Sequence, residues 1–187
     1  MDLLTHLFLP LTVAYVLRRE LFGHPVTLGL TGFSVLSDFD KFLGHQGLLH
    51  SLVTIVPICL AVLAAERWYR GEWQYAPLIA GFMSSHLLLD LIDGGPVPLL
   101  YPFVEQGLGF RYPAQTVFGT GPVGMSIRGP LVDTKTAAPR AGYNTFGFLT
   151  GDGIAWLLVF VVVYVGLRRQ KRSEQSVTAA ADGGEET

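Results

Sequence analysis

The chain has 187 residues, of which 50% are hydrophobic and only 15% are charged, and its mean hydropathy is +0.41. Soluble domains carry roughly 25% charged residues, so this composition is typical of a membrane protein and excludes an ordinary soluble domain. A formal net charge of −2 gives no indication of nucleic-acid binding, and one cysteine, Cys59, excludes a disulfide framework or a thiolate metal site.

Five apolar runs follow one another along the chain. They cover residues 3–17, 26–36, 50–65, 75–92 and 154–167. We therefore expect an all-α integral membrane bundle of about five hydrophobic segments, which form one helical membrane domain over residues 1–172. Several runs are shorter than the ~20 residues that span a bilayer, so the alternatives are tilt, helices that include polar turns, or partial insertion. The second run is the weakest, and it either spans the membrane or is re-entrant.

Basic residues follow the first, third and fifth runs. They are Arg18 with Arg19, Arg67 with Arg70, and the cluster at residues 168–172. Since basic residues concentrate on the cytoplasmic side of membrane proteins, we expect an N-terminus on the outer side and a cytoplasmic C-terminal tail. The tail, residues 173–187, is small, polar and acidic, and we expect it to be disordered.

A long segment rich in glycine and proline separates the fourth and fifth runs, over residues 94–153. The topology predicts that it is an external loop, and its turn residues favour an irregular cap. The stretch at residues 119–124 resembles a glycine-rich phosphate loop only superficially, because no Lys-Ser or Lys-Thr pair follows it.

Polar groups interrupt the fourth run at helical spacing. His86, Asp90 and Asp93 are four and three residues apart, which places them on one face of a helix. Ionisable groups are costly in an apolar segment and usually pair with one another, with a proton or with a metal. The alternative is one buried histidine satisfied by a nearby aspartate, with Asp93 as an ordinary residue at the helix end.

The expected topology brings many such groups to the outer side of the membrane, whereas His24 falls in an inner loop. Neutral imidazoles and carboxylates together are ligands for zinc, manganese or iron, whereas magnesium and calcium prefer oxygen alone. We expect a divalent transition metal, with zinc first and manganese or iron as alternatives. The candidate metal ligands are His6, Asp38, His45, His50, His86 and Asp90, and the candidate general bases are Asp40 and Asp93.

Several short motifs resemble a known family. They are T-H at 5–6, S-D-F-D at 37–40, H-Q-G-L-L-H-S at 45–51, G-F-M-S-S-H-L-L-L-D at 81–90 and the later L-L-Y-P-F. Together they are similar, in the same order, to the YdjM-like membrane-bound, metal-dependent hydrolases. That family is distantly similar to zinc-dependent phospholipase C, which implies phosphoester chemistry at a lipid–water boundary.

Three positions depart from the pattern of that family. This chain has Ser37 in place of the usual proline, Gln46 in place of arginine, and Asp93 in place of threonine. An arginine at position 46 could hold a phosphate with two parallel hydrogen bonds, which glutamine cannot reproduce. The ligand set is intact, but these departures weaken the expectation of a phosphate substrate.

The sequence therefore predicts a membrane-bound metal-dependent hydrolase that acts on an ester or phosphoester at the membrane surface. Its expected partners are membrane lipid and a small-molecule or lipid substrate, with no nucleic acid. Two alternatives remain: a metal or proton transporter that uses the His/Asp cluster as a relay, and a membrane scaffold with a structural metal.

Overall fold

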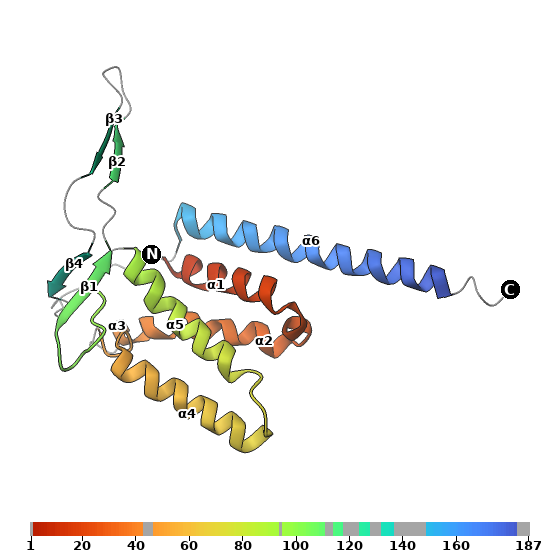
Figure 1. The fold of residues 1–187 in the computed structure, drawn as a ribbon, viewed down its shortest axis with the longest axis horizontal. Helices are drawn as coiled ribbons and strands as arrows, with labels where there is room; N and C mark the ends of the chain where they lie inside the picture. Colours follow the sequence, from red (N-terminus) through yellow and green to blue (C-terminus); the bar gives the residue numbers. More distant parts are fainter. Residues whose placement is uncertain are drawn as a thin grey trace.

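The computed structural model describes residues 2–42, 47–93, 95–110, 114–117, 124–127, 132–136 and 149–182. The described chain is mostly helical, as the composition predicts (Figure 1). The helices are α1 (Leu3–Leu17), α2 (Pro25–Gly29), α3 (Phe39–Phe42), α4 (Leu52–Arg70), α5 (Ala76–Ile92) and α6 (Gly151–Asp182), with 3-10 helices η1 (Arg19–Gly23) and η2 (Leu30–Asp38).

Helix α5 is the centre of the helical part. It contacts α1, η2 and α4, while α1 packs along α6 (Figure 1). Its side chains enter two hydrophobic clusters of the described residues: Met83 and Leu87 pack with Ile55 of α4, and Phe82 packs with Leu11 of α1. The helix that carries His86 and Asp90 is therefore held from several sides.

The second apolar run does not form one regular α-helix. It consists of α2 followed by the nine-residue 3-10 helix η2. Hydroxyl groups bond back to carbonyl oxygens along it: Thr31 donates to Leu28 at 2.7 Å and Ser34 donates to Thr31 at 2.7 Å. Such bonds compete with the α-helical pattern, which explains why this run winds more tightly.

Two helices in the described part of the chain are long and apolar enough to cross a membrane: α4, with 19 residues, and residues Gly151–Glu174 of α6. Only 6% of each apolar window is buried inside the protein. The exposed side chains include Val56 and Leu60 of α4. Apolar faces of this size need lipid or a partner to cover them. The helices α1 and α5 are shorter, at 15 and 17 residues.

Aromatic residues mark one end of α4. Trp68, Tyr69 and Trp73 are all exposed beside Arg67 and Arg70. Tryptophan and tyrosine are enriched at the level of the lipid headgroups, so this end of α4 has the composition of a membrane boundary.

The segment between α5 and α6 contains β-structure that the sequence analysis missed. Strand β1 (Gln106–Phe110) pairs with β4 (Val132–Thr136), and β2 (Ala114–Val117) pairs with β3 (Gly124–Ile127), both antiparallel. A bridge between Val97 and Leu108 places β1 beside the C-terminal end of α5 (Figure 1). Short strands with many Gly and Thr residues show too little apolar alternation to be predicted.

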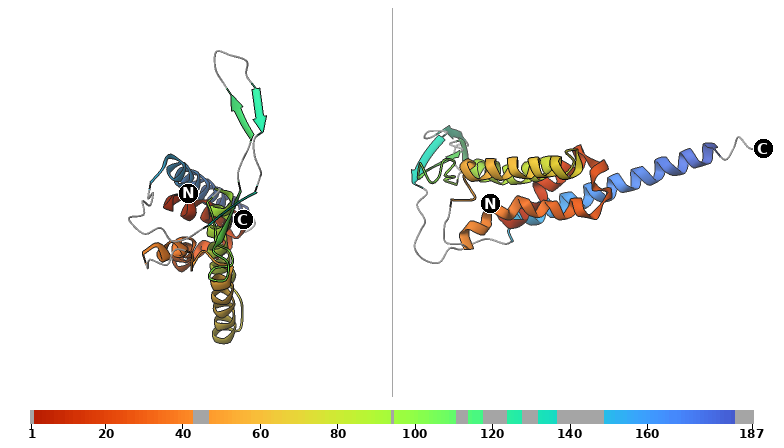
Figure 2. Two further views of the ribbon diagram at one scale, coloured as in Figure 1. Left: turned by 90° about the vertical axis from the view of Figure 1, so that its left-hand side faces the viewer. Right: turned by 90° about the horizontal axis from the view of Figure 1, so that it is seen from below.

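The start of the tail differs from the expected disorder. Helix α6 continues past Ser173 to Asp182 and extends beyond the other helices (Figure 2). Gln170 donates a hydrogen bond to Glu174 at 3.1 Å, and alanines occupy residues 179–181, so local helix-forming interactions outweigh the polar composition. Residues 183–187 lie outside the described part.

Candidate metal centre

Five of the predicted ligands lie together at one end of the helical part. His6 lies on the first turns of α1, Asp38 ends η2, His50 lies just before α4, and His86 and Asp90 are one turn apart on α5. The five form two overlapping groups, each with ligand atoms within 4.8 Å of one another. The site thus joins four segments that are far apart in the sequence.

A capping residue fixes the position of His50. Ser51 caps α4 by accepting a hydrogen bond from the Val53 amide at 3.1 Å, and its hydroxyl lies 2.7 Å from the Tyr101 carbonyl. The Leu52 amide donates to the Leu99 carbonyl at 2.9 Å. The segment after α5 therefore holds the start of α4, and His50 with it.

The hydrogen-bond partner of each Nδ1 determines the tautomer of His86 and of His50. His86 Nδ1 lies 2.6 Å from the Ser34 carbonyl, which can only accept, so Nδ1 carries the proton. His50 Nδ1 lies 2.8 Å from Asp40 Oδ2, an acceptor as well when the carboxylate is ionised. In the neutral rings, both Nε2 atoms therefore present lone pairs.

Asp40 contacts Nδ1 of His50, whereas Nε2 of the same ring faces His86 and Asp90. Its Oδ2 also accepts hydrogen bonds from the amides of Gly47 at 2.9 Å and Leu49 at 3.2 Å. The carboxylate is fully buried. A buried carboxylate that is fixed by two amides holds the ring orientation of His50, as carboxylates behind metal-binding histidines commonly do.

Carboxylate oxygens of Asp38 and Asp90 lie close to Nε2 of both His50 and His86. His50 Nε2 and His86 Nε2 are 3.3 Å apart, and each is 3.3 Å from Asp90 Oδ2. Asp38 Oδ1 lies 3.5 Å from His86 Nε2 and 3.8 Å from His50 Nε2. Ligands at about 2.0–2.1 Å from a tetrahedral ion are about 3.3 Å from one another, so His50 Nε2, His86 Nε2 and Asp90 Oδ2 have the spacing of ligands to such an ion, and Asp38 Oδ1 lies beside the two imidazoles.

These donors have the chemistry to hold a cation. Two neutral imidazoles and two carboxylates offer only acceptors to their common centre, and close acceptors repel unless a positive charge lies between them. Burial alone would lower the pKa of His50, but hydrogen bonds with Asp40 and Asp90 raise it above its ordinary value. Protons and a metal ion would therefore compete for these groups.

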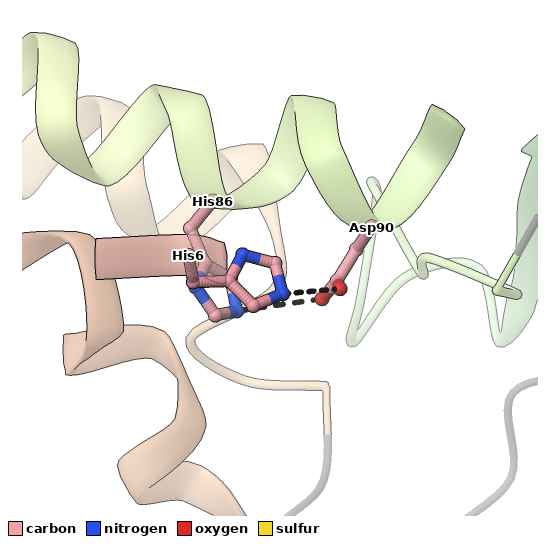
Figure 3. A group of neighbouring side chains, drawn as sticks. All are labelled: His6, His86 and Asp90. Carbon is pink, nitrogen blue, oxygen red and sulfur yellow. Dashed lines mark ion pairs between the residues drawn. The ribbon is translucent and has the colours of Figure 1, made fainter. Parts of the chain in front are cut away.

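The fifth residue, His6, lies beside His86 and points toward the Asp90 carboxylate (Figure 3). Its Nε2 lies 3.1 Å from Asp90 Oδ1, and its ring stacks on His86 with centroids 4.1 Å apart. In the described part of the chain, the buried His6 Nδ1 has no hydrogen-bond partner. His6 either binds an ion directly or holds Asp90 so that Oδ2 faces the centre.

The remaining predicted residues have other positions. Asp93 is exposed at the C-cap of α5 and belongs to neither group of ligand atoms. His24 caps α2 and is exposed, away from the cluster, as its place in an inner loop leads us to expect. His45 lies outside the described residues.

Sequence reasoning missed the groups that orient the histidines. The Ser34 carbonyl, which fixes His86, belongs to the backbone and has no signature in the sequence. The amides of Gly47 and Leu49, which fix Asp40, are equally invisible. The spacing of Asp40 and His50 in the sequence does not predict their contact, because the two residues meet only when the turn between them folds.

A model of the YdjM inner membrane protein family matches residues 1–174, which is nearly the whole chain. No curated protein and no solved structure matches the chain. The similarity to phospholipase C therefore remains a prediction. The family, together with the two apolar candidate spans, supports a location in a membrane.

Proposed function

The chain belongs to the YdjM inner membrane protein family, and we propose that it is a membrane-bound, metal-dependent hydrolase. One observation carries the proposal: four lone-pair donors from three segments lie close together, with Nε2 of His50 and of His86 each 3.3–3.8 Å from a carboxylate oxygen of Asp38 and of Asp90, and no donor hydrogen is among them in the neutral site. A scaffold does not require such a centre, because buried histidines are satisfied at lower cost by a single acceptor.

The proposed ligands are His50, His86 and Asp38, with zinc as an ion that suits imidazole and carboxylate ligands, and three protein ligands leave a fourth position open on the side of Asp90. When bound, such an ion supplies Lewis-acid chemistry and lowers the pKa of a coordinated water. The protein's own contribution is to hold both imidazoles in the tautomer that presents Nε2.

Asp90 is the best candidate to accept a proton during hydrolysis. Its side chain is 18% exposed, whereas that of His86 is fully buried and that of Asp38 is 5% exposed. Water or substrate therefore reaches the site on the side of Asp90. In this proposal His6 Nε2, which lies 3.1 Å from Asp90 Oδ1, carries the proton of that hydrogen bond, and Asp90 Oδ2 faces the two imidazoles. Asp40, expected to be a candidate base, is engaged with His50 and has a positioning role in this proposal.

The proposed substrate is an ester or phosphoester at the membrane surface. The site lies where α1 and α4 begin and α5 ends, so it is at the end of the apolar helices rather than at their middle. This position suits a substrate with a polar bond near the headgroup level. We further propose that this end faces outward, because the basic residues Arg18, Arg67 and Arg168 lie at the opposite ends of the apolar stretches of α1, α4 and α6.

Labelling of single cysteines in a Cys59→Ser background tests the proposed orientation. Glu105→Cys lies near the site end, and Glu72→Cys lies near the basic end; both positions are exposed. An impermeant thiol reagent should label position 105 in intact cells and position 72 only after lysis. The reverse pattern would overturn the orientation.

The hydrolase is tested with purified protein in detergent micelles, zinc or manganese, and a panel of phosphoesters and lipid esters. Asp90→Asn keeps the shape of the side chain and removes its charge. Hydrolysis should fall by at least about tenfold, the lower end for loss of a ligand, an orienting carboxylate or a base.

Asp93→Asn is the matched control, since it makes the same change three residues away on an exposed carboxylate. Its activity should equal that of the unaltered protein. If no ester is cleaved while Asp90→Asn abolishes metal uptake into sealed vesicles, the protein is a transporter and the hydrolase proposal fails.

A further inference from the structure

A polar pocket lies at the end of the protein that is opposite the His/Asp site. Its volume is about 300 Å³, and it lies between α6 and the turn after α1. Three of its lining residues are cationic: Arg19, Arg168 and Lys171. Nothing in the proposed hydrolysis uses this pocket.

The positive charge of the pocket is not neutralised by its own lining. Glu20 is the one carboxylate among the described lining residues, and it forms an ion pair with Arg18 at 2.6 Å. The Arg19 guanidinium lies 3.5 Å from the Leu167 carbonyl, which positions it toward α6. Three cations thus face one pocket whose carboxylate is already engaged, which suits an anion.

The walls of the pocket are partly apolar. Tyr15 and Phe22 line it, and the Arg168 guanidinium lies 4.8 Å above the ring of Tyr164. Stacking of this kind fixes the guanidinium plane beside an apolar surface. A site for a small free anion does not need such walls, whereas a site for an amphipathic ligand does.

One face of α6 carries exposed apolar side chains, and basic residues follow them on that same face. Val162 is 70% exposed and Val165 is 40% exposed. Arg169 and Arg172 follow them at spacings of seven residues, on the same face of the helix. A second hollow of about 230 Å³ lies along this face, and Val165, Arg169 and Arg172 are among its lining residues.

We propose that this end of the protein binds an anionic phospholipid, with the headgroup phosphate between Arg19, Arg168 and Lys171 and the acyl chains along α6. The apolar part of α6 ends where its arginines begin, so the pocket lies at the boundary where a headgroup would lie. Basic pockets between helices at this level are suited to anionic headgroups. This site is independent of the metal centre and of the proposed hydrolysis.

Native mass spectrometry of the full-length protein tests the proposal. Protein purified in neutral detergent is incubated with phosphatidylglycerol or with phosphatidylcholine of the same acyl chains. Phosphatidylglycerol should remain bound in preference to phosphatidylcholine, and Arg168→Gln with Lys171→Gln should weaken its binding by at least about tenfold. The double variant Arg168→Lys with Lys171→Arg, which keeps the charge, should retain most of the binding.

Arg67→Gln with Arg70→Gln is the matched control, because it removes two charges at the same end of the protein and outside the pocket. It should bind phosphatidylglycerol like the unaltered protein. Equal binding of both lipids, or an equal loss in both glutamine variants, would overturn the pocket as a lipid site. Complete displacement of the lipid by millimolar inorganic phosphate would show a free-phosphate site and would overturn the proposal too.

Discussion

The two central histidines differ in what holds them. His86 is fixed by a backbone carbonyl, at Ser34, and His50 is fixed by a carboxylate, at Asp40. A carboxylate makes the imidazole more basic and stabilises positive charge nearby, whereas a carbonyl mainly sets orientation. Replacing Asp40 by asparagine removes its charge and keeps its shape. The substitution therefore separates the effect of the charge on metal affinity from the effect of the ring orientation.

Asp40→Asn should lower the affinity of the site for zinc by about 10–100-fold, the range for loss of a group that orients a ligand. The amide oxygen of the asparagine can still accept the hydrogen bond from His50 Nδ1. The loss of zinc affinity therefore reflects the missing charge more than a change of shape. Competition with a chromophoric chelator measures the affinity. Asp93→Asn should leave it unchanged, and an unchanged affinity in Asp40→Asn would remove the positioning role.

Residue spacing within one helix was enough to predict part of the site. His86 and Asp90 are four residues apart on an apolar helix, and the structure brings them to one centre. The approach of His6, Asp38 and His50 followed from the expected topology and the family resemblance, and not from spacing. The roles of Ser34 and of the amides at Gly47 and Leu49 could not be predicted, because backbone groups occur at every position.

At the scale of the elements, one partly buried carboxylate connects α4 to α5. Glu66 accepts hydrogen bonds from the amides of Gln74 at 3.2 Å, Tyr75 at 2.9 Å and Ala76 at 2.7 Å. These amides belong to the start of α5, whose N-cap, Tyr75, makes no side-chain cap of its own. Negative charge at a helix N-terminus is favourable, so Glu66 stabilises both the turn and α5.

Glu66→Ala should destabilise the protein by about 1–3 kcal/mol, since it leaves partly buried amides without their acceptor. The melting temperature in detergent should fall by at least about 2–4 °C. Glu72→Ala, at an exposed position in the same turn, should change it little. Equal melting temperatures for the two variants would show that Glu66 is not a structural cap.

The sequence predicted the long helices better than the short elements. Four apolar runs correspond to α1, α4, α5 and α6, because a long hydrophobic stretch has few other ways to satisfy its backbone. The second run became η2 through hydroxyl bonds from residues such as Thr31 and Ser34, which periodicity does not register. The strands in residues 94–153 were missed, because their pairing joins β1 to β4 across a long stretch of chain.

On the scale of the whole molecule, the two ends have opposite chemistry. The end with His50 and Asp90 gathers imidazoles and carboxylates, and the end with Arg19 and Arg168 gathers cations. Apolar helices connect them, with α4 and part of α6 long enough to cross a membrane. The molecule therefore suits a position across a bilayer, with the proposed metal site at one end and the proposed lipid site at the other.

The metal content of purified protein tests the central claim most directly. The protein is equilibrated with zinc, manganese and iron, freed of unbound metal, and analysed beside His86→Ala and His24→Ala. Because His86 lies at the centre of the donor set and His24 caps α2 elsewhere, the unaltered protein and His24→Ala should each hold about one equivalent of metal or more. His86→Ala should hold far less. An unaltered protein without metal, or equal metal in all three, would contradict the metal centre.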